Sequence, residues 1–145
     1  MCSVTSALYS RDILRLAASI PHHGRLADAR ASAERSSLVC GSRIVVDVVT
    51  DDEGRIAALG QEVSACALGQ ASAALMGAHA IGRTQTELTD ARDALAAYLS
   101  GTSDDPGDWP GLSVFAEARR FSARHGAILL PFEAAAEAAG KVPAR

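Results

Sequence analysis

The sequence predicts an α+β fold in which an N-terminal helix precedes a three-stranded antiparallel sheet, with further helices packed on one sheet face. Three observations indicate this class. Apolar residues recur at helical spacing from 5 to 20, the segment 43–50 is rich in Val and Ile and runs into a turn, and helical spacing returns after Cys66. A helix followed by strands and then by helices is an element order typical of α+β proteins.

The first helix is predicted over 5–20, because Ile13, Leu16 and Ile20 share one face while Arg11 and Arg15 lie between them. The segment Pro21-His22-His23-Gly24 ends this helix, since proline disfavours helical geometry in the residue before it.

A β-meander is predicted over 29–65. A weakly alternating edge strand comes first, at 29–37, and is followed by the strong strand 43–50. Asp51-Asp52-Glu53-Gly54 has the composition of a tight turn, so 55–65 is expected to return as the third strand.

Three helices are predicted after the sheet, over 67–81, 87–100 and 128–139. The second begins after a capping-box pair formed by Thr84 and Glu87. The start of the last helix is placed near Ile128, because Pro131 then falls in the first turn, where its missing N–H costs little.

The chain has 145 residues and a net charge of −3, with 48% hydrophobic and 4% aromatic residues. These values predict one domain, 1–145, with a core of its own. Scattered basic residues and few aromatic rings argue against nucleic acid or a membrane surface as a partner. No apolar stretch reaches the ~20 residues of a membrane span, and no secretory signal is present, so we expect a cytoplasmic protein.

Three cysteines at wide spacing do not describe a disulfide framework, which favours reduced thiols available for metal or sulfur chemistry. Cys2 lies at the extreme terminus and is set aside. Closing the hairpin with Thr50 opposite Arg55 places Cys40 opposite Ala65, next to Cys66. Opposed side chains have Cβ atoms roughly 4.5–5.5 Å apart, so two distant thiols are expected to meet at one end of the sheet.

Cys66 also stands where a strand passes into a helix, so free backbone N–H groups and the helix dipole favour its thiolate. Paired thiols suit a soft metal ion or an iron–sulfur cluster. The alternative is that both cysteines are small buried apolar residues, since free cysteine is among the most buried residue types.

The motifs around these cysteines resemble those of the U-type iron–sulfur cluster assembly scaffolds, of the IscU, SufU and NifU amino-terminal type. The resemblance rests on Cys40-Gly41 before a Val/Ile-rich strand, the turn at 52–55, and Cys66-Ala-Leu-Gly-Gln-Ala-Ser72 opening a helix. It extends from about Tyr9 to Ala138. In that family three cysteines and an aspartate receive iron and sulfur, build a [2Fe–2S] cluster or hold zinc, and pass the product on.

Transferred to this chain, the resemblance makes Cys40 the first cysteine and Cys66 the second. The family aspartate falls on Ser42, and the third cysteine falls on Gly126. His125 directly precedes Gly126 and is a candidate third ligand, because imidazole binds zinc and iron. A surface histidine flanking a helix is the alternative for His125.

The resemblance implies a non-enzymatic scaffold or carrier that binds iron, a [2Fe–2S] cluster or zinc through Cys40 and Cys66, and imidazole chemistry adds His125 as a candidate metal ligand. Its expected partners are a cysteine desulfurase and recipient apoproteins. Two other functions fit the same residues. One is a sulfur-relay protein in which Cys66 accepts a persulfide and Cys40 resolves it. The other is a metal-free homologue that keeps the fold as a surface for binding partners.

Overall fold

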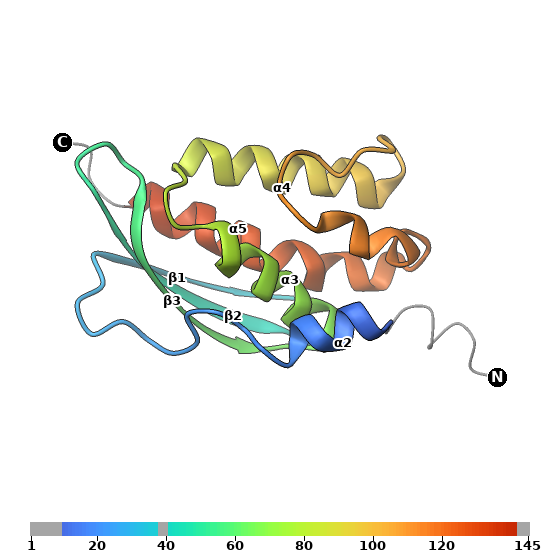
Figure 1. The fold of residues 1–145 in the computed structure, drawn as a ribbon, viewed down its shortest axis with the longest axis horizontal. Coiled ribbons are helices and arrows are strands. Elements are labelled where there is room, and N and C mark those ends of the chain that lie inside the picture. The colour runs from blue at the N-terminus through green and yellow to red at the C-terminus, as the bar shows by residue number, and fades with distance from the viewer. Residues whose placement is uncertain (1–9, 38–40, 142–145) are drawn as a thin grey trace.

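The computed structural model describes residues 10–37 and 41–141, and its elements follow the predicted order of helix, strands and helices (Figure 1). In chain order they are α2 (Arg11–Ala17), β1 (Ala31–Ser36), β2 (Arg43–Thr50), β3 (Ile56–Ser64), α3 (Ala67–His79), α4 (Gln85–Ser100), the 3₁₀ helices η1 (Leu112–Arg120) and η2 (Ser122–Arg124), and α5 (His125–Lys141).

The three strands form an antiparallel sheet in the order β1-β2-β3, with β2 at the centre. On β2, Ile44, Val46 and Val48 are almost fully buried and belong to the main core. Helices α3 and α5 pack against the sheet, and α4 lies on α5, farther from the strands (Figure 1). The predicted α+β class is therefore confirmed.

Local capping signals explain where α2 and α4 begin. Ser10 precedes α2, and its hydroxyl accepts a hydrogen bond from the Ile13 N–H. The predicted capping box is present at α4, where Thr84 and Glu87 each accept a bond from the other's backbone N–H. Helix α2 is shorter than predicted, because it ends at Ala17, and residues 5–9 of the predicted helix lie outside the described residues. In the part of the chain that the structure describes, no helix combines the length and the apolar character needed to cross a membrane.

The predicted start of the last helix near Ile128 is wrong, because α5 begins at His125 and Pro131 lies inside it. Pro131 has no N–H to give to the carbonyl of Ala127, one helical turn earlier, so that turn loses a hydrogen bond. Tertiary contacts compensate, since Ala127 and Ile128 are buried and the Ser72 hydroxyl of α3 donates to the Ile128 carbonyl. Packing against α3 thus outweighs the local preference on which the sequence prediction relied.

The loop between α2 and β1 closes the free edge of β3. The backbone N–H of Gln61 donates to the His22 carbonyl at 3.0 Å, and the Gln61 carbonyl accepts from Gly24 at 2.7 Å. The side-chain amide of Gln61 donates to Pro21 at 3.1 Å and to Ala73 of α3 at 3.0 Å. One buried residue therefore joins the loop, the edge strand and α3.

The same loop is held over the outer face of the sheet by Asp47 of β2, whose side chain is fully buried. Its carboxylate accepts bonds from the Arg25 guanidinium at 2.7 and 3.1 Å, from the Leu26 N–H at 3.0 Å and from the Ser32 hydroxyl. Burial opposes the charge, but these hydrogen bonds outweigh it and lower the pKa of Asp47. An aspartate inside a Val-rich strand is thus explained by the loop that it anchors.

We predict that Asp47→Asn removes on the order of 2 kcal/mol of stability at neutral pH, because buried donors lose their charged acceptor. The folded-state pKa of Asp47 lies below that of an unfolded aspartate, which is about 3.9. The stability that ionised Asp47 contributes is therefore present above the unfolded-state pKa and is lost as the pH falls through the folded-state pKa. Urea unfolding at several pH values measures this.

The matched control is Asp90→Asn, on an exposed face of α4. The parent and Asp90→Asn proteins should lose stability on acidification more steeply than Asp47→Asn does. Parallel acid profiles for all three proteins would contradict the role given to Asp47.

Candidate functional site

Cys66 stands at the passage from β3 to α3, as the sequence predicts. It is the N-cap residue of α3, with an extended backbone conformation (φ −66°, ψ 170°), and its side chain makes no capping hydrogen bond. The thiol is free and half-buried. The first-turn N–H groups of α3 therefore lie beside an accessible sulfur, an arrangement that suits an anionic ligand or an incoming soft metal ion.

The turn between β1 and β2 carries the other predicted thiol. Cys40 lies outside the described residues, as does Cys2, so the meeting of Cys40 with Cys66 remains a prediction. The flanking backbone is well defined, because the Ser37 N–H donates to the Ser42 carbonyl at 2.8 Å and the Gly41 N–H donates to the Ser37 carbonyl at 2.9 Å.

The hairpin register on which that prediction rests is shifted. Thr50 pairs with Ile56 instead of Arg55, and an irregularity between Val49 and Thr50 moves the remaining pairs one residue further. The physical cause is a wider turn, in which Asp51 pairs with Arg55 by a backbone bond and its carboxylate accepts the Arg55 N–H. The last pair is Arg43 with Ser64.

Carried past that pair, the observed register sets Gly41 opposite Cys66, where the predicted register set Val39. A shift of two positions keeps every side chain on its predicted face of the sheet. Gly41 directly follows Cys40, so the shift still directs the β1–β2 turn toward Cys66. The proximity of the two thiols stays a prediction, because Cys40 lies outside the described residues.

His125 is the first residue of α5 and is half-buried. Its Nε2 donates to the carbonyl of Ala118 in η1 at 2.9 Å, since a carbonyl can only accept. In a neutral imidazole this leaves the lone pair on Nδ1. Metal-binding histidines commonly donate their second ring nitrogen to a backbone carbonyl, so the contact with Ala118 fits a ligand role through Nδ1.

The first turn of α5 lies against both of the other segments. A Cβ atom on the exposed residue Gly126 would stand 3.1 Å from the Ser37 hydroxyl, which belongs to the turn that contains Cys40. On its other side, Ala127 faces Gly69 in the first turns of α3. The segments that carry Cys40, Cys66 and His125 therefore converge at one end of the sheet.

The described part of the chain contains no cluster of three or more His, Cys, Asp or Glu side chains that could hold a metal ion. Cys66 and His125 are the donors that the structure describes at this end, and Cys40 is the further thiol that the sequence supplies. Ser42 is buried, and its carbonyl accepts the Ser37 N–H.

Comparison with known proteins assigns the chain to a family. The crystal structure of a nitrogen-fixing NifU-like protein (N-terminal) from Brucella abortus superposes with a TM-score of 0.89, at 35% identity over 97% of each chain. The chain belongs to the U-type (IscU, SufU and NifU-like) scaffold family. The iron–sulfur cluster assembly scaffold protein IscU of Thermotoga maritima is 27% identical over 139 residues, which is 96% of this chain and 97% of the relative.

A SufU-type protein of Fervidobacterium islandicum AW-1 has the same fold, with a TM-score of 0.84 at 23% identity, covering 93% of this chain and 98% of its own. No family model matches the chain.

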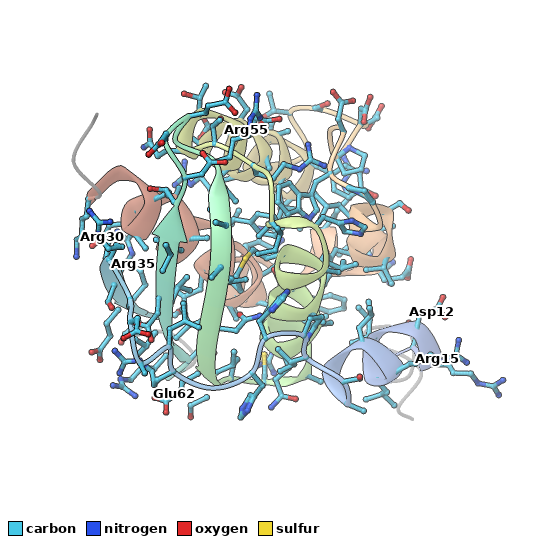
Figure 2. All side chains as sticks on the ribbon, turned by 60° about the vertical axis from the view of Figure 1, so that its left-hand side comes forward. Asp12, Arg15, Arg30, Arg35, Arg55 and Glu62 are labelled. Carbon is cyan, nitrogen blue, oxygen red and sulfur yellow. The ribbon has the colours of Figure 1, made fainter. Side chains whose placement is uncertain are left out.

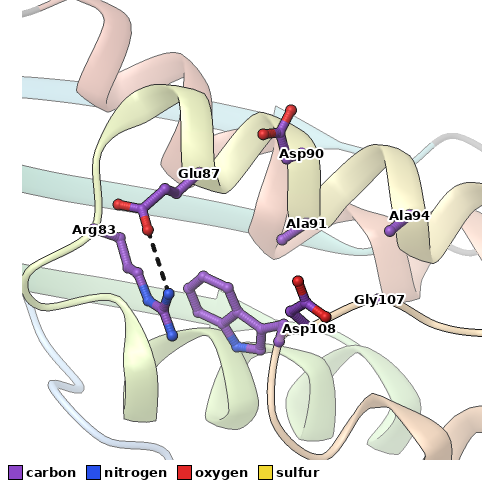
Figure 3. Close-up of a pocket in the computed structure, with 8 residues that line it drawn as sticks. Arg83, Glu87, Asp90, Ala91, Ala94, Gly107 and Asp108 are labelled. Carbon is purple, nitrogen blue, oxygen red and sulfur yellow. Dashed lines mark hydrogen bonds and ion pairs between the residues drawn. The ribbon is translucent and has the colours of Figure 1, made fainter.

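One pocket of this U-type chain lies away from the converging segments, at the far end of α3 (Figure 3). Helix α3 has 13 residues, so roughly 20 Å separates its two ends. The pocket is lined by Arg83, Glu87, Asp108 and Trp109, among others. The Arg83 guanidinium stacks over the indole ring of Trp109 at 5.0 Å and bonds to Glu87, so these groups stabilise each other. This position separates the pocket from Cys66.

We predict that neutral His125 carries its proton on Nε2. Nuclear magnetic resonance of ¹⁵N-labelled protein at about pH 8.5, above the ordinary titration range of imidazole, should show the coupling pattern of the Nε2–H tautomer. A ring protonated on Nδ1 would contradict the hydrogen bond to Ala118 and would remove Nδ1 as a donor for metal. His22 and His23, exposed in the loop before β1, provide internal references.

Proposed function

We propose that this protein is a scaffold or carrier in iron–sulfur cluster assembly, with the thiolates of Cys40 and Cys66 and Nδ1 of His125 as the donors that hold its cargo. The cargo is iron or a [2Fe–2S] cluster, with zinc as an alternative occupant. The observation that carries the proposal is the position of Cys66. Cys66, whose thiol is free, is the N-cap residue of α3 and lies near the first turn of α5 and the residues that flank the β1–β2 turn.

Family membership supports the scaffold role, and the chemistry of the donors supports the cargo. Thiolates and imidazole are the ligands that iron–sulfur clusters and zinc prefer. A cysteine desulfurase would supply sulfur, and recipient apoproteins would take the product. The chain would then act in the cytoplasm as a carrier and not as an enzyme, because the chemistry takes place at the metal.

Three donors leave one position of a four-ligand set open. Ser42 does not fill it readily, since its side chain is buried, and Gly126 has no donor atom. The open position would be taken by water, by sulfide or by a partner's ligand. An open set favours exchange of cargo over permanent storage, as a scaffold requires.

Sulfur relay is a second candidate, favoured by the accessibility of Cys66. In that reaction the Cys66 thiolate attacks the terminal sulfur of a desulfurase persulfide. The sulfur–sulfur bond of the donor breaks, Cys66 becomes the persulfide, and the desulfurase thiolate leaves. Metal and labile-sulfur analysis of protein purified without oxygen distinguishes the two candidates. Iron with sulfide supports the scaffold, whereas sulfur without metal supports the relay.

We predict that Cys66→Ser lowers iron and sulfide loading by roughly tenfold or more, because a principal ligand is lost. Cys2→Ser is the matched control, since it removes a thiol that belongs to no predicted site. Loading is measured after anaerobic reconstitution with ferrous iron and sulfide, by metal analysis and visible absorption. Equal losses in the two variants would show that the reactive thiol is misplaced.

We also predict that Gly126→Cys strengthens metal retention, because its side chain would point toward Ser37 beside the Cys40 turn. The new Cβ atom would stand 3.1 Å from the Ser37 hydroxyl, which has to move by a few tenths of an ångström to admit it. Gly126→Ser is the control for size, and His125→Ala tests the imidazole. Metal remaining after chelator treatment is the measurement.

The expected order of metal retention is Gly126→Cys above the parent, the parent equal to Gly126→Ser, and His125→Ala lowest. A parent protein that already keeps its full metal complement and is unaffected by His125→Ala would show that the third ligand is wrongly assigned.

A further inference from the structure

Two residues of α3 make specific contacts with the start of α5. Gly69 and Ser72 are three positions apart and therefore lie on the same face of the helix. Ser72 is fully buried, and its hydroxyl donates to the Ile128 carbonyl at 2.5 Å. A Cβ atom on Gly69 would come within 3.4 Å of the Ala127 carbonyl oxygen and 2.8 Å of the Ala65 side chain, so no larger residue fits without movement.

This contact meets α5 at the turn that Pro131 interrupts. Without an N–H on Pro131, the Ala127 carbonyl has no helical donor, and it faces the space left by Gly69. The next carbonyl along, that of Ile128, receives the Ser72 hydroxyl. The opened turn of α5 therefore meets both Gly69 and Ser72 of α3, a contact that aligns the two helices.

The hydroxyl is unusual in its surroundings. Every other buried residue of α3 is apolar or glycine. Burying a hydroxyl costs free energy unless it is hydrogen-bonded, and an alanine would fill an interface of small side chains without that cost. Packing alone therefore does not explain why residue 72 is a serine. A hydrogen bond that holds the Ile128 carbonyl in place does explain it.

Both helices begin at candidate donors, with Cys66 at the N-cap of α3 and His125 as the first residue of α5. We propose that Ser72 is a positioning residue for the cargo site, where its hydrogen bond to Ile128 sets the separation between the Cys66 thiol and the His125 imidazole. The effect of Ser72 on cargo binding rests on the proposed function, but the spacing between Cys66 and His125 can be measured without metal.

The first experiment measures spacing in metal-free protein. A nitroxide label is attached to Cys66 in a Cys2→Ser, Cys40→Ser background, and broadening of the backbone N–H signals of His125 and Gly126 reports their distance from the label. Ser72→Ala should change this broadening, while Ser72→Thr, which keeps the hydroxyl, should preserve it. Gly69→Ala should also change the spacing, because its added methyl group would press on Ala65 and Ala127. This variant provides the test if Ser72→Ala does not fold.

The second experiment uses cobalt(II) as a probe of the site in the native cysteine background. Ser72→Ala should weaken cobalt binding by roughly tenfold and shift the visible ligand-field bands, as loss of a supporting contact commonly does. The control is Thr84→Ala, which removes the cap of α4 at the opposite end of the sheet and should lower thermal stability without altering the cobalt spectrum.

Unchanged broadening in both Ser72→Ala and Gly69→Ala would overturn the positioning role, whatever their thermal stability. Altered spacing with unaltered cobalt affinity and spectrum would also overturn it, because the alignment would then not matter to the site. If the parent protein shows no thiolate-to-cobalt absorption, the proposed function fails. The effect of Ser72 on helix alignment is still measured by the broadening from the nitroxide label.

Discussion

The alignment of α3 on α5 is the constraint on which the candidate site depends. Each helix begins at a candidate donor, and Cys66 at the N-cap of α3 makes no capping hydrogen bond with its side chain. The relative position of the two helices is set by Gly69 and Ser72 against the turn opened by Pro131. Because the contact combines a close approach and a directed hydrogen bond, it specifies one alignment more sharply than apolar packing could.

A second set of bonds fixes the strand that leads into Cys66. Strand β3 is at the edge of the sheet, where unpaired backbone groups would invite fraying or pairing with another chain. Gln61 prevents this by pairing with His22 and Gly24, while Asp47 anchors the same loop through Arg25. Figure 2 shows the strands together with the described side chains. The strand before Cys66 is therefore held on both sides, which limits the movement of the backbone that leads into this thiol.

The parts of this fold that could be predicted from sequence are those determined by local chemistry. The Val/Ile-rich strand β2 and the Thr84–Glu87 capping box are local signals, and both are present as predicted. The start of α5 was wrong because tertiary contacts outweighed the cost of Pro131 inside a helix. The hairpin register was wrong by two residues because the side chain of Asp51 widened the turn. Asp47 and Ser72 were missed, since each acts only through a partner distant in sequence.

The donor set suggests how such a site could release its cargo. A closed four-ligand site holds metal tightly because every position is filled by the protein. Ser42 is buried, whereas Gly126 is exposed and has no side-chain donor atom. The open coordination position would therefore face the first turn of α5 and the solvent. A partner that brings one thiolate could enter at Gly126 without displacing a protein ligand. Transfer would then begin by addition of a ligand, which avoids breaking a metal–thiolate bond in the first step. On the proposed donor set, a chain with Gly126 in place of a thiol would depend on a partner for the last ligand of its cargo.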